Sequence, residues 1–81
     1  MDNETTDRVV YWLSPLGDED DFGQPYGTAP GSVMYDAKTR LGPRANMTEA
    51  SFQVFGFGVL GTGVGQRYVK QLDGRWLKVG G

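Results

Sequence analysis

The 81-residue chain contains neither cysteine nor histidine. It can therefore form no disulfide, and it lacks the two side chains that hold most structural zinc. It also has no cysteine nucleophile and no histidine acid–base group, so catalysis would depend on carboxylates, hydroxyls, lysines or tyrosines. Only Asp36 and Glu49 lie in an apolar sequence setting, where ordinary turn and cap roles explain them. We therefore expect a non-enzymatic protein with no catalytic residues, no cofactor and no metal site.

Long apolar runs are absent as well. No stretch approaches the roughly 18 apolar residues of a membrane-spanning helix. Residues 1–13 also lack the basic and apolar regions of a signal peptide. Hydrophobic residues make up 38% of the chain and aromatic residues 12%, which is enough for one folded domain over residues 1–81. We expect a soluble, cytoplasmic protein that makes no membrane contact.

Charge is distributed unevenly along the chain. Residues 1–35 carry seven acids and one base, whereas residues 36–81 carry three acids and seven bases. Such a division is typical of a protein with an acidic arm and a basic binding face. It is equally consistent with two halves that neutralise each other across the fold.

The first half of the chain predicts two strands and a long loop. Residues 8–13 are rich in β-branched and aromatic side chains and predict an N-terminal strand. Residues 14–31 contain glycines, prolines and the acidic run 18–21, and predict a long or mobile loop. Residues 32–35 predict a second short strand, followed by a turn over residues 36–38.

A short central helix is expected over residues 47–55. Asn46 is a suitable N-cap, and Glu49 three positions later completes a capping box. Gly56 follows the last apolar position and can end the helix in the left-handed conformation. Together with the strands, this helix predicts a small single domain of the α+β class, with an N-terminal strand, a central helix and a C-terminal β-hairpin.

The hairpin is predicted from Asp73-Gly74, which lies between two alternating apolar runs. These two residues are typical of a two-residue type I′ turn. With that turn, Trp76 lies opposite Gln71 on the exposed face of the hairpin, and Leu72 lies on the core face. We therefore expect Trp76 to form an exposed aromatic patch among basic side chains.

The candidate partner-binding residues are aromatic or basic, and they come from the hairpin and the N-terminal strand. They are Trp12, Arg67, Lys70, Arg75, Trp76 and Lys78. Tryptophan and arginine are frequent anchors of protein interfaces, and we expect a protein partner or a homo-oligomer. The alternative is nucleic-acid binding, with bases along the phosphates and an aromatic face for stacking.

The segment over residues 56–65 holds five glycines. Residues 56–61 match the G-x-G-x-x-G pattern, but a helix rather than a strand is expected before them, which argues against a dinucleotide site. Two interpretations stay open. The segment is either a tight crossover between the helix and the hairpin, or a nest of N–H groups that binds an anion.

Three segments occur in a characteristic order, namely residues 36–39, 42–52 and 58–68. They resemble the Asp-Gly-x-Thr, Gly-Pro-Trp-Ala-x-Met-Cys-x-x-Cys-Phe and Gly-x-Gly-Leu-Gly-Thr-Gly-x-Gly-Gln-x-Tyr segments of a family of small zinc-ribbon-like proteins common in phage and bacterial genomes. The resemblance implies a ribbon-like scaffold of phage origin. It also implies a virion component or a binder of a host protein, located in the virion or the host cytoplasm.

The chain departs from this family at the metal site. Thr48 and Ser51 stand at the positions of one cysteine pair, and the other pair would fall within residues 27–30, where no ligand stands. Arg44 replaces the family tryptophan. Two hydroxyls cannot replace two thiolates as zinc ligands, so the resemblance implies a metal-free scaffold. We expect the N-terminal strand, docked on the hairpin, or a partner chain to replace the stability that a metal supplies.

Overall fold

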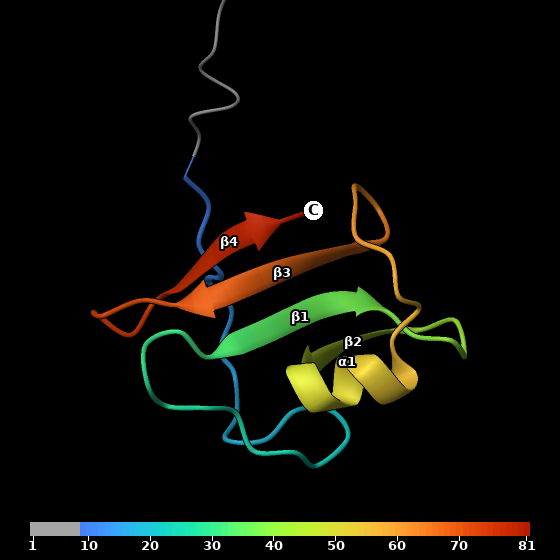
Figure 1. Cartoon of the computed structure of the whole chain (residues 1–81), viewed down its shortest axis with the longest axis horizontal. Coiled ribbons are helices and arrows are strands. Elements are labelled where there is room, and N and C mark those ends of the chain that lie inside the picture. Colours follow the sequence, from blue (N-terminus) through green and yellow to red (C-terminus); the bar gives the residue numbers. More distant parts are fainter. Residues whose placement is uncertain (1–8) are drawn as a thin grey trace, which may run out of the picture.

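A computed structural model describes residues 9–81, so the first three acids and Arg8 lie outside the described residues. Its centre is a four-stranded antiparallel sheet in the order β2-β1-β3-β4 (Figure 1). The elements are β1 (Val33–Lys38), β2 (Arg44–Thr48), α1 (Glu49–Phe55), β3 (Gly65–Lys70) and β4 (Trp76–Gly80). The predicted α+β class was wrong, because 38% of the structure is strand and only 10% is helix.

The sheet is buried on both faces around β1. Side chains alternate along a strand, so Tyr35 and Ala37 point to one face while Met34 points to the other. Met34 and Ala37 are fully buried, and Tyr35 is 5% exposed. The turn predicted over residues 36–38 was wrong, because β1 continues to Lys38 and pairs there with β2.

On the first face, the buried side chains of β1 and β2 lie under α1. The rings of Tyr35 and Phe52 stack with their centroids 3.9 Å apart. The helix begins at Glu49, and its N-cap is Thr48, whose hydroxyl accepts from the Ser51 N–H at 3.2 Å, rather than the predicted Asn46. Asn46 belongs to β2 because it pairs with Asp36 of the central strand. Long-range strand pairing thus overrides the local capping signal.

The helix ends before Gly56, as expected, but the conformation differs from the prediction. Gly56 is extended, with φ −69° and ψ 156°, rather than left-handed. A glycine is still required there, because a Cβ atom would lie 2.5 Å from the carbonyl oxygen and the ring of Phe52. The residue is therefore selected by close packing against the helix.

Residues 9–31 run as mostly irregular chain (Figure 1). On the second face, three of their side chains, Trp12, Leu16 and Tyr26, pack against the core cluster of the sheet. The backbone N–H of Trp12 donates to the Trp76 carbonyl at 3.0 Å. The Trp12 ring meets the Tyr68 ring edge to face, with centroids 5.6 Å apart. Lys78 donates its N–H to the Val10 carbonyl at 2.8 Å. The predicted N-terminal strand was wrong over its described residues, because this segment joins β4 by a single bridge at Tyr11.

The C-terminal hairpin is present as β3 and β4, but its turn differs from the prediction. Gln71 and Arg75 close a three-residue loop, through a 2.7 Å bond from the Gln71 N–H to the Arg75 carbonyl. Within this loop only Gly74 takes a positive φ, 89°. Throughout residues 9–81, positive φ angles occur only at glycines. A type I′ turn also needs a positive φ at Asp73, whereas a type I turn followed by a left-handed glycine does not. The Asp73 carboxylate instead accepts the Arg75 N–H at 3.0 Å.

The extra loop residue shifts the register by one position and reverses the faces of β4. Trp76 lies opposite Lys70 instead of Gln71, and only 8% of its surface is exposed. Leu72, predicted in the core, is 94% exposed. The prediction of an exposed Trp76 patch was therefore wrong, and Trp76 forms the second core cluster with Met34 and Tyr68.

The observed register makes a stability prediction. Trp76→Ala removes a buried ring, and we expect it to lower the free energy of unfolding by about 3–5 kcal/mol. Leu72→Ala removes an exposed side chain and should change that free energy by no more than about 0.5 kcal/mol. Urea unfolding of both variants measures the difference. A larger effect at Leu72 than at Trp76 would contradict the register.

Candidate functional site

The carboxylate of Asp20 joins the long loop to the edge of the sheet. Asp20 is only 6% exposed. Its Oδ2 atom accepts from the Thr48 N–H at 2.8 Å and from the Thr48 hydroxyl at 2.9 Å. Its Oδ1 atom accepts from the N–H groups of Phe22 and Gln24, both at 2.9 Å. One carboxylate therefore shapes the turn over residues 20–24 and satisfies an outer donor of β2.

Asp21 extends this attachment along β2. Its N–H donates to the Asn46 carbonyl at 3.0 Å, and its Oδ2 atom accepts the Asn46 N–H at 2.7 Å. An uncovered edge strand presents unpaired backbone groups that invite other chains to pair. The acidic run thus covers the outer edge of β2.

The two hydroxyl residues singled out by the zinc-ribbon resemblance adjoin this carboxylate. Burial raises the pKa of Asp20, whereas the Ser51 hydroxyl and the N–H groups of Thr48, Gln24 and Phe22 lower it, and the net result is a pKa of about 2. The Ser51 hydroxyl lies near the carboxylate but forms no hydrogen bond, so the four hydrogen bonds to Asp20 come from Thr48, Phe22 and Gln24. Over residues 9–81, no three His, Cys, Asp or Glu side chains gather closely enough to hold a metal ion.

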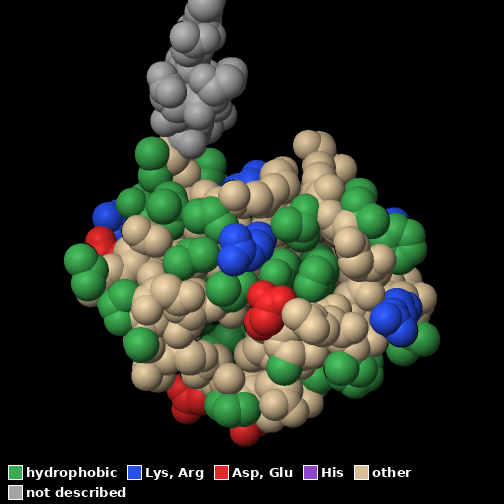
Figure 2. Space-filling model, in the orientation of Figure 1, with side chains coloured by type: hydrophobic (Ala, Val, Ile, Leu, Met, Phe, Trp, Pro, Cys, Tyr) green, Lys and Arg blue, Asp and Glu red, His purple; other side chains and the backbone are tan. Residues whose placement is uncertain are grey.

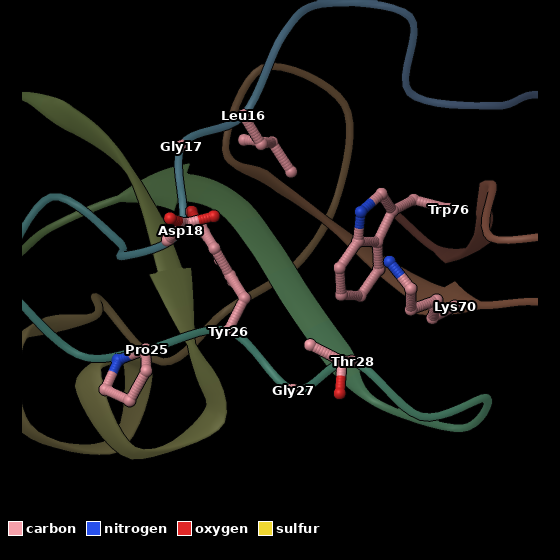
Figure 3. A pocket seen from close by; sticks show the side chains of 9 residues that line it. All are labelled: Leu16, Gly17, Asp18, Pro25, Tyr26, Gly27, Thr28, Lys70 and Trp76. Atoms are coloured by element: carbon pink, nitrogen blue, oxygen red, sulfur yellow. The ribbon is translucent and has the colours of Figure 1, made fainter.

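A pocket of about 420 Å³ opens between the loop and the β3–β4 hairpin (Figure 3). The side chains that shape it are Leu16, Asp18, Tyr26, Thr28, Lys70 and Trp76. The Lys70 ammonium lies 4.8 Å from the centre of the Trp76 ring. The Tyr26 and Trp76 rings meet at 61° with centroids 6.0 Å apart. The pocket therefore brings together two of the sequence-predicted residues, Lys70 and Trp76.

The other sequence-predicted residues lie elsewhere. Arg67 pairs with Tyr35 and shares its face of the sheet, opposite to that of Lys70. The Arg75 guanidinium lies 4.0 Å from the centre of the Tyr11 ring and forms a 2.8 Å ion pair with Asp73. Lys78 lies opposite Tyr68, against which Trp12 packs. The six predicted residues therefore do not form one continuous surface.

A surface that the sequence analysis missed lies where α1 ends beside the β1–β2 turn. Five of the ten large apolar side chains most exposed in residues 9–81 come from the end of α1, the chain directly after it and the β1–β2 turn, and we call them the helix-end patch: Leu41, Val54, Phe55, Phe57 and Val59. Figure 2 shows hydrophobic side chains around a basic group at the right of the molecule, where Figure 1 places the end of α1 and the β1–β2 turn. Their spacing in the sequence gives no periodic signal, because two loops and a helix end contribute them.

The glycine-rich segment forms the crossover from α1 to β3. The Gly61 carbonyl accepts from the N–H groups of Val64 and Gly65, both at 3.0 Å, and the Val64 carbonyl accepts the Lys38 N–H at 2.9 Å. Gly65 must be small, because its Cβ would lie 2.6 Å from that of Ala37. Of the two interpretations left open by the sequence, the structure therefore supplies direct evidence for the crossover.

The Asp20 attachment makes a pH-dependent prediction. Its pKa is lowered from 3.8 to about 2, so the charged carboxylate stabilises the fold above about pH 4, and this contribution is lost as the pH falls towards 2. The shift corresponds to about 2 kcal/mol. We expect Asp20→Asn to lose about this amount at pH 7 and to lack most of the decline between pH 4 and 2.

Urea unfolding over that pH range provides the measurement. Asp18→Asn is the matched control, since Asp18 is exposed and its side chain forms no ion pair within residues 9–81. An Asp20→Asn protein as stable as the wild type at pH 7 would exclude the proposed anchoring role.

Two further findings concern the chain as a whole. In residues 9–81, no helix is both long and apolar enough to cross a membrane. Comparison with protein-family models, with curated proteins and with solved structures finds no match to this chain.

Proposed function

We propose that this chain is a non-enzymatic binding module that acts through protein–protein interaction, with the helix-end patch as its contact surface. The exposure of Phe57 and Leu41, 58% and 85% respectively, carries the proposal. Single exposed apolar side chains are ordinary, whereas a group of them marks an interaction site. Aromatic side chains are also enriched in the central part of protein interfaces.

Backbone contacts hold the patch in a defined shape. The Arg40 N–H donates to the Phe55 carbonyl at 2.8 Å, and the Phe57 N–H donates to the Lys38 carbonyl at 3.0 Å. The Phe55 ring also stacks on Phe22, with centroids 4.1 Å apart. A surface that is ordered before binding loses less conformational entropy when a partner docks.

One exposed base, Arg40, borders the patch, because its Nε–H donates to the Gly56 carbonyl at 3.4 Å. Electrostatic complementarity to this base and burial of the apolar side chains therefore favour a partner surface that carries apolar residues beside Asp or Glu. The resemblance to phage proteins directs the search for that partner to virion proteins and host proteins.

The test removes apolar surface from the patch. We expect the double variant Phe57→Ser/Val59→Ser to bind its partner at least about tenfold more weakly than the wild type, because buried anchors each contribute more than about 1 kcal/mol. Partners are identified by affinity purification from the native host, and the purified partner is then titrated against each variant by calorimetry.

Leu72→Ser serves as the matched control, since Leu72 is 94% exposed and lies in the β3–β4 turn. Thermal unfolding confirms that all variants stay folded. Recovery of the bare monomer at mild salt, or a partner that the double variant binds as tightly as the wild type, would contradict the proposal. Binding of single-stranded DNA that weakens steeply with salt would instead support the nucleic-acid alternative.

A further inference from the structure

The pocket of Figure 3 is separate from the helix-end patch and shares no residue with it. Its volume of about 420 Å³ falls in the range of small-molecule sites, which is about 300 to 1,000 Å³. Its walls come from two parts of the chain, residues 16–28 and the β3–β4 hairpin. The charge and the apolar surface of these two walls determine which ligand the pocket can bind.

The hairpin wall carries a positive charge. Lys70 extends over the Trp76 ring, with its ammonium 4.8 Å from the ring centre. Within residues 9–81 no carboxylate lies in ion-pair range of this ammonium. Lys70 is therefore placed to receive an anionic group of a ligand.

The loop wall is negative. Asp18 faces the pocket from this side, opposite Lys70 and Trp76 (Figure 3), and forms no ion pair within residues 9–81. Burial, and to a smaller extent the nearby charges of Asp20 and Asp21, raise the pKa of Tyr26 to about 12. This wall favours an ammonium group and disfavours a second anion.

Apolar surface lies between the two charges. Leu16, Tyr26 and Trp76 line this part of the pocket, and the two rings meet edge to face. An aromatic or aliphatic body can pack there. A multiply charged phosphate suits the site poorly, because it would meet one lysine and a negative wall, and a simple cation would be repelled by Lys70.

We infer that this pocket binds a small zwitterion that has a carboxylate at one end, an ammonium group at the other and an apolar side chain on the body between them, as in a short peptide with free ends. The carboxylate meets Lys70, the ammonium meets Asp18, and the apolar side chain packs on Tyr26 and Trp76. The Thr28 side chain, which also lines the pocket, supplies a further hydrogen-bonding group.

The test titrates the dipeptide alanyl-phenylalanine into ¹⁵N-labelled full-length protein and follows the Trp76 indole N–H and the Lys70 amide by NMR. The free dipeptide should shift these signals with a saturable, millimolar affinity. N-acetylation or C-amidation of the dipeptide should each weaken binding by about tenfold, which corresponds to about 1.4 kcal/mol.

Two variants assign the charges. Lys70→Met should weaken binding of the free dipeptide by about tenfold but leave the affinity for the C-amidated dipeptide unchanged. The substitution and the amidation remove the same contact between the ammonium and the carboxylate, so their effects do not add. Asp18→Asn should likewise weaken binding of the free dipeptide by about tenfold and leave the affinity for the N-acetylated dipeptide unchanged. Lys38→Met, which changes an exposed lysine outside the pocket, should bind as the wild type does.

Three results would overturn the inference. They are no shift of the pocket signals at millimolar dipeptide, equal affinity for free and capped dipeptides, or dependence on the carboxylate alone. If Lys70→Met fails to fold, the capped dipeptides on the wild-type protein decide the question. The helix-end variants leave this pocket intact, so failure here is distinguishable from failure of the proposed protein–protein interaction.

Discussion

The attachment of the Asp20 carboxylate to β2 is the contact on which the rest of this structure depends. Residues 14–31 contain no helix and only one isolated bridge, so backbone pairing within the loop cannot hold it in place. The buried Asp20 carboxylate accepts two hydrogen bonds from Thr48, and these bonds attach the loop to β2. From this anchor the chain places Tyr26 on the pocket wall and Phe22 against Phe55. Both candidate surfaces therefore depend on one hydrogen-bonded carboxylate.

This anchor also contributes to the stability of a chain that has no cysteine to form a disulfide. From the sequence we expected a zinc-ribbon-like scaffold over residues 35–68, in which the thiolates of that family would stand at the positions of Thr48 and Ser51. In the structure these two side chains adjoin a carboxylate instead. The expected contribution of this anchor, about 2 kcal/mol from the lowered pKa of Asp20, is smaller than the roughly 10 kcal/mol or more that structural zinc contributes in small domains. The two-faced core, in which Met34 and Met47 are fully buried, supplies further stability.

The sheet also separates the two surfaces. The pocket lies over the face that carries Met34, Tyr68 and Trp76, whereas the helix-end patch lies where α1 leaves the opposite face. Alternation along β1 produces this division, because neighbouring residues Met34 and Tyr35 belong to different core clusters. A peptide-sized ligand and a protein partner could therefore occupy the molecule together.

Local patterns in the sequence determined the features that depend on neighbouring residues. The start of β1, the end of α1 before Gly56 and a turn at Asp73-Gly74 were all recognisable, since each rests on propensity or on a glycine in a tight position. The candidate site was recognisable only in part, through Lys70 and Trp76.

Tertiary structure alone decided the rest. Pairing with β1 drew Asn46 away from the helix cap, and one additional loop residue turned Trp76 from the surface into the core. The role of Asp20 was hidden for a similar reason, because its donors on Thr48 lie 28 positions away in the chain. An acidic run in a glycine-rich loop has the same sequence pattern whether it is solvated or buried, and only the strand edge that it meets determines which.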